Sequence, residues 1–499
     1  MSVRRDIAAN YFGTSWAAVM NLAFLPAFVR ILGLEGFGVI GFFTLLQSSL
    51  VLLDFGFSPA LSRRFACETQ SAVERQRAHD LLRSSEVAIA AVAVTLVFAV
   101  AWISPWLADE WLQGRLLDKA ELISSLRVMG AVVGARLLEN LYRGALIGLH
   151  QQVGLNGIGA AVATLRGPGA LLVLAYIAPD LNVYFGWQLA VSGISILLLA
   201  RLTRRSLGAM ARPPRFDIGA LRGLVRFAGG VTVVASLGFL LTQIDKILLS
   251  RLLDLHEFGL YSFGVTIAQA PLGFVGPVAQ AFFPRFSAMI TRGDEEGFRQ
   301  AYHACSQIVS VLLGSATVIL VVFGEQLLAA WTRDSNLATR SYGFIALLSL
   351  GSMLNGLMTV PYFVQLASGW LGLLVRANIV AILLVIPALV LVVPRYGPTG
   401  AAAVWLCLNL GYAIFMPPIM HKRMLRGELA AWWKMDVLLP IGIAACIGLA
   451  CGTGASLVAS RSLSWLVVGA SAAAVLIGAA AVAPAMRQTL LRVSPLGYD

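Results

Sequence analysis

Charged residues are scarce in this chain. Asp, Glu, Lys and Arg make up 12% of its 499 residues, whereas roughly a quarter of the residues in soluble globular domains are charged. Apolar residues make up 58% of the chain, and its mean hydropathy is +0.81. Lipid must therefore be its main solvent. The composition excludes a soluble globular protein and predicts an integral membrane protein.

Motifs for metal binding and catalysis are also lacking. No pair of cysteines has metal-ligand spacing with histidines nearby, so we expect neither zinc nor disulfides. The five histidines are scattered, and the chain has no catalytic triad and no phosphate-binding Gly-Lys loop. The sequence predicts that the protein is not an enzyme and holds no resident cofactor. The cysteines are Cys67, Cys305, Cys407, Cys446 and Cys451.

Long apolar runs dominate what is present. They are about 20 or more residues long and lack the alternation of barrel strands, so the spans are helices. We expect an all-α polytopic membrane protein with about fourteen spans, and no soluble domain of useful size. The expected spans are 8–32, 36–62, 86–106, 122–149, 153–178, 182–200, 225–249, 258–284, 300–324, 341–366, 371–393, 398–420, 437–458 and 463–485.

The basic residues indicate the orientation of these spans. With both termini on the cytoplasmic side, about three quarters of the Lys and Arg in the loops fall on the inner side. The net charge of +12 is thus explained by membrane orientation. Nucleic-acid binding is not expected, because the basic residues are spread over many short loops and form no single stripe.

A sequence repeat suggests an internal duplication. At a constant offset of 221 residues, Leu34 and Gly38 recur as Leu255 and Gly259, among nine identities. Six spans separate the copies, so both halves face the same way. We expect an N-terminal lobe at 1–202, a cytoplasmic linker at 203–223, a C-terminal lobe at 224–422, and two additional helices with the C-terminal tail at 423–499. Residues 218–227 in and after the linker have the pattern of a short helix lying in the membrane interface.

Intramembrane charges are costly, at roughly 2.5 to 3.5 kcal/mol each, and they normally face a cavity or a partner. Arg136, Glu139, Asn140 and Arg143 fall within an arc of about 100° on one helix. Arg166 lies near the middle of the next span, beside a Gly-Pro-Gly sequence that permits a bend. Two interpretations stay open. Either Arg136 and Glu139 neutralise each other at i,i+3, or the arginines line a positive cavity for an anion.

Other charges within the predicted spans are candidates for coupling or gating. Asp245 and Lys246 are adjacent, point about 100° apart and are not expected to pair only with each other. Asp54 either pairs with the neighbouring arginines or caps the inner end of the second span. Arg376 lies close to the inner surface and is either a substrate ligand or a snorkelling side chain.

Three short stretches carry a family resemblance. They are Ile31–Gly38 with Leu53–Arg63, Leu141–Gln151, and Gln243–Arg251 running into Phe258–Tyr261. Over essentially its full length, the chain resembles the Wzx-type polysaccharide flippases of the multidrug/oligosaccharidyl-lipid/polysaccharide exporter superfamily.

The resemblance implies two six-helix lobes plus two helices, a central cavity that opens alternately to either side, and location in the inner membrane. It also implies a cargo of undecaprenyl-diphosphate-linked sugar, such as an O-antigen or exopolysaccharide repeat unit. On this view Arg136, Asn140, Arg143, Arg166 and Arg376 bind the substrate. Glu139, Asp245, Lys246 and Asp54 couple or gate the transport, with proton or sodium counter-flow left open.

The implied partners are membrane lipid and, beyond the lipid-linked sugar, a polysaccharide polymerase and chain-length machinery. Two alternatives remain. A drug or cation antiporter of the same superfamily would need a carboxylate-dominated cavity, but the buried charges here are mostly basic. A membrane polysaccharide polymerase or ligase would need catalytic groups on a substantial outer loop, and no outer loop is longer than about 20 residues.

Overall fold

The computed structural model describes residues 3–492, except 55, 68–70, 220, 223–238, 240–241, 371 and 456–460. Within these ranges every regular element is a helix. In the described part of the chain, eight helices are long and apolar enough to cross a membrane, and a ninth candidate is a helix pair bent by 41°. The prediction of an all-α polytopic protein is confirmed, and the count of fourteen spans stays a prediction.

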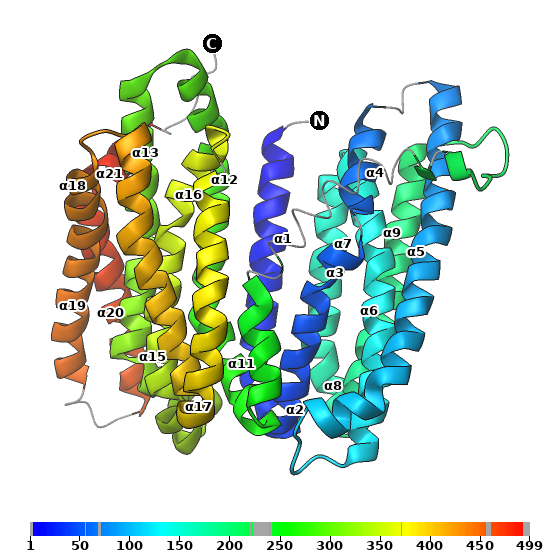
Figure 1. The fold of residues 1–499 in the computed structure, drawn as a ribbon, viewed down its shortest axis with the longest axis horizontal. Coiled ribbons are helices and arrows are strands. Elements are labelled where there is room, and N and C mark those ends of the chain that lie inside the picture. Colours follow the sequence, from blue (N-terminus) through cyan, green and yellow to red (C-terminus); the bar gives the residue numbers. More distant parts are fainter. Residues whose placement is uncertain are drawn as a thin grey trace. The chain divides into compact units, whose positions relative to one another are not determined.

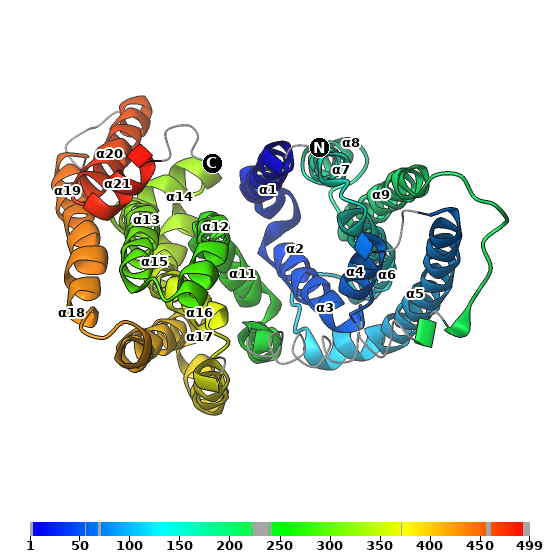
Figure 2. The same ribbon diagram turned by 90° about the horizontal axis from the view of Figure 1, so that it is seen from above.

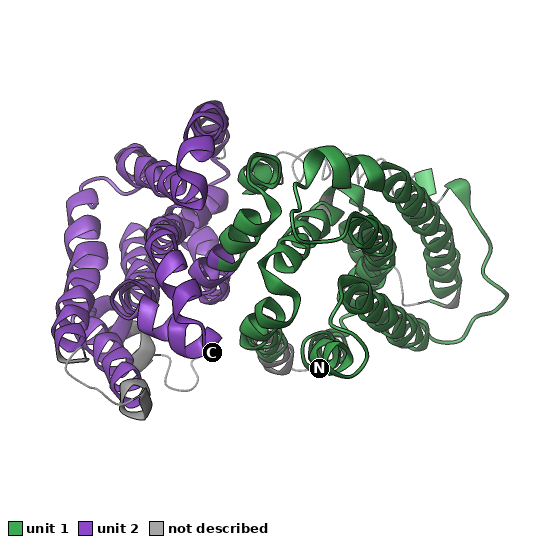
Figure 3. Cartoon of the chain, turned by 90° about the horizontal axis from the view of Figure 1, so that it is seen from below, with its two compact units in different colours: residues 1–263 green, residues 264–499 purple. Residues whose placement is uncertain are grey.

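The chain forms two compact units, residues 1–263 and 264–499 (Figure 3). The boundary falls inside helix α11 (Leu255–Gln269), so residues 242–263 pack with the first unit. The predicted lobes are defined by the order of the helices along the chain, whereas the two units are defined by which residues pack together. The lobe boundaries therefore stay a prediction, and the interfacial helix predicted at 218–227 lies mostly outside the described residues.

Unit 1 is organised around α6, which packs against α4, α5 and α9 (Figure 2). Gly144 and Gly148 let α4 approach closely, because a Cβ atom at either position would overlap the backbone of Ser58 or Ser62. The elements of unit 1 are α1 (Val3–Ala23), α2 (Leu25–Ser48), α3 (Leu50–Leu53), α4 (Phe57–Cys67), α5 (Ala72–Trp106), η1 (Leu107–Trp111), α6 (Lys119–Gly148), α7 (Gln152–Arg166), α8 (Pro168–Tyr176), α9 (Leu181–Leu207) and the start of α11.

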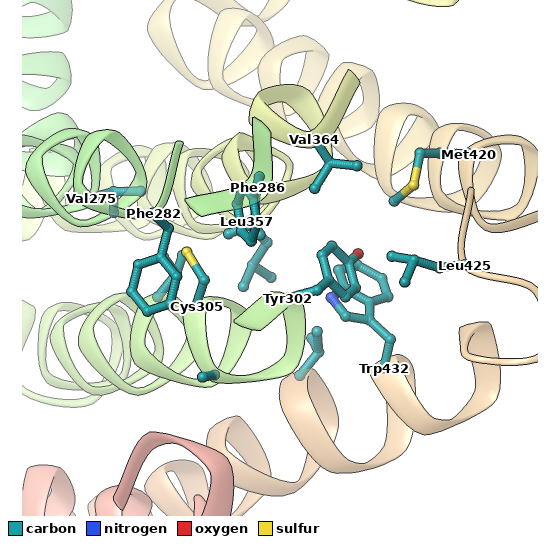
Figure 4. Packing of buried hydrophobic residues seen from close by; sticks show 14 of the residues in the cluster. Val275, Phe282, Phe286, Tyr302, Cys305, Leu357, Val364, Met420, Leu425 and Trp432 are labelled. Atoms are coloured by element: carbon teal, nitrogen blue, oxygen red, sulfur yellow. The ribbon is translucent and has the colours of Figure 1, made fainter. Parts of the chain in front are cut away.

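Unit 2 is organised around α13, which packs against α12, α15, α19 and α20 (Figure 1). Its core joins α12, α13 and η2, and Figure 4 shows Tyr302 beside Trp432, with Phe282 and Phe286 nearby. The elements are the end of α11, α12 (Leu272–Arg292), α13 (Glu295–Val322), α14 (Gly324–Thr332), α15 (Ser335–Leu357), α16 (Thr359–Ala367), α17 (Gly372–Met424), α18 (Leu429–Ala431), η2 (Trp432–Leu438), α19 (Leu439–Ala455), α20 (Arg461–Ala481) and α21 (Pro484–Arg492).

Glycines mark two breaks within continuous helical segments. Gly33 in α2 has φ 72° and Gly397 in α17 has φ 55°, a backbone region that glycine adopts without a steric penalty. The break at Gly33 separates the end of the predicted first span from the second. The break at Gly397, followed by Pro398, separates the predicted eleventh span from the twelfth. The 53 residues of α17 therefore form two helical arms.

The repeated sequence positions meet each other inside unit 1. A Cβ atom on Gly38 of α2 would overlap the carbonyl oxygen of Leu255, and one on Gly259 of α11 would overlap the carbonyl oxygen of Leu34. Because Leu34 and Gly38 are the repeat counterparts of Leu255 and Gly259, this contact is reciprocal. Two helices related by a local two-fold axis cross in this manner, and only glycine permits so close a backbone approach.

Candidate functional site

The candidate site lies in unit 1, where α6 carries Arg136, Glu139, Asn140 and Arg143. The helix is buried along most of its length because small and apolar side chains face α4, α5 and α9. Glu139 is 3% exposed, whereas Arg136, Asn140 and Arg143 are half-buried. The sequence places the four on one face, and the neighbouring helices determine what each side chain contacts.

Glu139 pairs with Arg166, the last residue of α7. The Arg166 Nη2 atom lies 2.6 Å from Glu139 Oε1 and 3.0 Å from the hydroxyl oxygen of Ser192 on α9. Of the two interpretations left open by the sequence, the one that paired Glu139 with Arg136 is therefore wrong. The carboxylate of Glu139 binds the guanidinium of Arg166 on the adjacent helix instead of that of Arg136 at i,i+3.

A helix break positions Arg166. Gly167 ends α7 and Pro168 begins α8, so the main chain bends immediately after the arginine. A Cβ atom on Gly167 would come within 3.3 Å of a backbone oxygen of α1, at Met20, so the small residue allows close packing there. Gln188 of α9 donates to the freed Arg166 carbonyl at 3.2 Å. The Gly-Pro-Gly sequence thus marks a helix break with close packing, and a side chain satisfies the carbonyl there.

Arg136 is held by a different helix. One of its Nη atoms donates to the side-chain oxygen of Gln47 on α2, and its guanidinium lies 5.3 Å from the centre of the Phe43 ring. Both interactions favour a charged arginine. Among the described residues, the Nε atoms of Arg136 and Arg166 are buried and have no hydrogen-bond partner. These two donors are available to a further acceptor.

The cluster carries an excess of positive charge. Arg143 lies within electrostatic range of Glu139 and Arg166, and Arg136 is within range of all three. Three cations therefore share one anion. Charges removed from water are costly unless they are compensated, and one carboxylate compensates one of the three. The arrangement suits the binding of an anion with more than one negative charge.

A second carboxylate of unit 1 was missed by the sequence analysis. Glu86 of α5 is 8% exposed and accepts from Tyr142 at 2.8 Å and from Arg204 at 3.2 Å. It stands at the first residue of the predicted third span and was not among the candidate site residues. Tyr142, between Leu141 and Arg143 in the second motif, is the signal that could have indicated a buried partner.

The predicted gating residues have separate partners. Asp245 faces Tyr261, whose hydroxyl lies 3.4 Å from its Oδ2 atom, and Lys246 donates to Gln243 at 3.2 Å. Each of the two adjacent charges thus has a contact besides its neighbour, as the sequence indicated. No coupling or gating role follows from these contacts alone.

Asp54 contacts a residue outside the arginine cluster, and Arg376 is exposed. Asp54 is buried and accepts from the Ser58 hydroxyl at 2.6 Å and the Ser58 amide at 3.0 Å, which caps the start of α4. Arg376 belongs to unit 2, in the first arm of α17, and its side chain is exposed. The structure brings Arg136, Glu139, Asn140, Arg143 and Arg166 together within one unit.

Comparisons with known proteins agree with this architecture. Residues 3–290, more than half of the chain, match a family described as polysaccharide biosynthesis protein. The chain belongs to this family. Among its relatives is a protein named as an O-antigen transporter in Shigella flexneri, 20% identical over 412 residues, which cover 81% of this chain and 94% of the relative. Another is the succinoglycan biosynthesis transport protein ExoT of Rhizobium meliloti (strain 1021), 23% identical over 66% of this chain and 64% of that protein.

Solved structures show the same fold at low sequence identity. The lipid II flippase MurJ in an inward closed conformation has a TM-score of 0.72 and 12% identity, covering 96% of this chain and 98% of that one. An inward-facing MATE family multidrug transporter of the MOP superfamily has a TM-score of 0.65 and 13% identity, covering 84% of this chain and 96% of that one. At these identities the likeness shows the fold alone. The two relatives named above are transport proteins and not enzymes.

Proposed function

We propose that the protein is a flippase. It moves an undecaprenyl-diphosphate-linked oligosaccharide, an O-antigen or exopolysaccharide repeat unit, from the inner to the outer leaflet of the bacterial inner membrane by alternating access. The observation that carries the proposal is the cationic cluster on α6 and α7, three arginines around one carboxylate, with two buried guanidinium donors that lack partners among the described residues. The names of the relatives supply the class of cargo.

The cluster provides what a diphosphate requires inside a membrane. Arginine holds phosphate oxygens in two places at once, and in a water-poor environment such charge-assisted hydrogen bonds are stronger than in bulk water. The two guanidinium charges that Glu139 does not balance, together with the amide of Asn140, replace the water of the headgroup. The polyprenyl tail needs no such replacement, because it remains in lipid.

The driving force follows from the same charges. An inside-negative potential favours outward movement of a negative charge by about 2.3 kcal/mol per charge for each 100 mV. We assign Glu139, Asp245, Lys246 and Asp54 to coupling or gating, because they are charged groups within the predicted spans. Proton or sodium counter-flow through the carboxylates would add to the potential. We also keep Arg376 as a proposed substrate ligand.

A cell-based experiment tests this function. Surface polysaccharide is measured in the native host after replacement of the gene with Arg136→Gln or Arg143→Gln, with the amount of membrane-inserted protein matched. Neither substitution removes the partner of a buried carboxylate, so we expect the protein level to be retained and export to fall. Arg127→Gln is the matched control, since Arg127 lies on the same helix with an exposed side chain. Normal export by both cluster variants would contradict the proposal.

A further inference from the structure

A second group of buried charges lies in unit 2 and has no part in the proposed cargo site. His303 of α13 stands between two carboxylates. Its Nδ1 atom lies 2.5 Å from Asp436 Oδ2 of η2, and its Nε2 atom lies 3.2 Å from Glu428 Oε2, just before α18. Asp436 is 1% exposed, whereas His303 and Glu428 are 16% and 18% exposed. The group therefore runs from a partly exposed end to a fully buried one.

The positions of the two carboxylates determine how many protons this group contains. A neutral imidazole has one N–H, so it donates from one ring nitrogen and accepts at the other. An ionised carboxylate only accepts. With a carboxylate at each ring nitrogen, a neutral ring and two ionised carboxylates would leave one contact with two acceptors and no hydrogen. The observed geometry is satisfied only when one further proton is present, either on the ring or on one of the carboxyl groups.

Neighbouring side chains fix both ends of the group. Gln307 of α13 donates to Asp436 Oδ1 at 2.9 Å, and its own oxygen accepts from the amides of Ala485 and Met486 at the start of α21. Arg299 of α13 lies 3.0 Å from Glu428 Oε1. Neither carboxylate can turn away from the ring without losing these hydrogen bonds. The need for a proton therefore cannot be relieved by a small rotation of one side chain.

Other titratable groups also face this site. Tyr302 and Cys305 of α13 lie beside it, Tyr302 within range of the Asp436 charge, and Glu296 pairs with Arg299. His421 of α17 is within range of His303 and Glu428. The Nδ1 atom of His421 lies 2.8 Å from the Pro417 carbonyl oxygen, so this nitrogen carries the ring hydrogen. His303 is therefore the histidine that lies between two acids.

We propose that His303, Asp436 and Glu428 form a proton-binding site that ties α13 to η2. The ligand is a proton from water on the side that the loop charges assign to the cytoplasm, and its binding forms one N–H or O–H bond within the group. When the proton is bound, the charges of the group balance. Positive and negative groups then alternate in the order Arg299, Glu428, His303 and Asp436. Loss of the proton places two acceptors against each other and weakens the contact between α13 and the C-terminal helices.

The π-helical form of η2 contributes to this link. Its seven residues, Trp432–Leu438, have a wider turn than an α-helix, and such turns are frequent at functional sites. Trp432 is 1% exposed and donates from its indole N–H to Ser306 of α13 at 3.1 Å. Asp436 lies one turn further along the same element. Figure 4 shows Trp432 beside Tyr302 of α13, and proton binding at Asp436 acts on the same short interface between α13 and η2.

The experiment measures the thermal stability of the full-length protein in lipid nanodiscs at about pH 6 and about pH 9, which bracket the usual range of histidine titration. We expect the melting temperature of the wild type to fall as the pH rises, because the folded site releases its proton. Hydrogen exchange in peptides covering 428–438, corrected for the intrinsic effect of pH, should rise over the same range. The proton probe is the buffer itself, so no transported ligand is needed.

Two substitutions and one control decide the outcome. Asp436→Asn supplies an amide that donates to Nδ1 of a neutral His303, so its stability should be retained and its pH dependence largely lost. His303→Gln should also lose the pH dependence, whatever its absolute stability. His79→Gln is the matched control, since His79 is a buried histidine of unit 1 that contacts the Gly208 carbonyl. A wild type with no pH dependence, or Asp436→Asn and His303→Gln variants that keep the full dependence, would overturn the proposal.

Discussion

The arginine cluster of unit 1 and the His303 group of unit 2 differ in how their buried charges are balanced. Among the described residues of unit 1, Arg136, Arg143 and Arg166 share the carboxylate of Glu139, so positive charge is left over. In unit 2, His303 and Arg299 alternate with Asp436 and Glu428, so the charges balance once a proton is bound. Balanced charges hold helices together, whereas unbalanced ones create an affinity for something outside the chain. The contrast assigns binding to the first cluster and helix attachment to the second.

The largest expected effect is the loss of Arg166. Arg166→Ala leaves Glu139 buried with its closest ion-pair partner removed, which costs roughly 3–5 kcal/mol for a buried pair. We expect little folded protein, measured by size-exclusion chromatography of the detergent-solubilised chain. The double substitution Arg166→Met with Glu139→Leu removes the pair as a whole and should recover folded protein. A single variant as well folded as the wild type would show that the pair is not a buried structural contact.

The next largest effect concerns unit 2. His303→Leu brings the buried Asp436 carboxylate against an apolar side chain, although Gln307 still donates to it. An uncompensated buried acid costs a few kcal/mol or takes up a proton instead. We expect a lower melting temperature at about pH 8 that recovers as the pH is lowered. Combining His303→Leu with Asp436→Asn should remove that recovery, and an unchanged pH response in the double variant would argue against Asp436 as its source.

The smallest effect belongs to the exposed end of the same group. Arg299 is 42% exposed where it meets Glu428, and ion pairs in contact with water contribute about 0–1 kcal/mol. Arg299→Gln should therefore shift the melting temperature little, and the shift should shrink further with added salt. A loss as large as that of His303→Leu would mean that the unit 2 group depends on its surface end, contrary to the gradient of burial.

Much of this architecture is predictable from the sequence. The hydropathy runs predict the helical spans, and the glycines at 33, 167 and 397 fall at the breaks that the structure shows. The polar face of α6 is also predictable, since 136, 139, 140 and 143 lie on one side of any helix. These features depend on local spacing, which a sequence contains directly.

The partners across helices are not predictable in this way. Nothing in the spacing of α6 indicates that Glu139 prefers Arg166 to Arg136, because that preference depends on how α7 bends beside α6. The unit 2 group was missed altogether, since His303 and Asp436 are 133 residues apart in sequence. Each residue by itself has the pattern of an isolated polar residue near the inner surface. Tertiary packing, not local pattern, creates that group.

The central claim is that the unbalanced arginines of unit 1 bind a diphosphate headgroup. The most direct measurement is the affinity of the purified full-length protein for undecaprenyl diphosphate in nanodiscs, for the wild type, for Arg136→Gln with Arg143→Gln, and for Arg127→Gln. Hydrogen bonds to charged groups contribute about 1.5–3 kcal/mol each, so the double variant should bind at least roughly tenfold more weakly while the control is unchanged. Equal affinity of the double variant and the wild type would contradict the account.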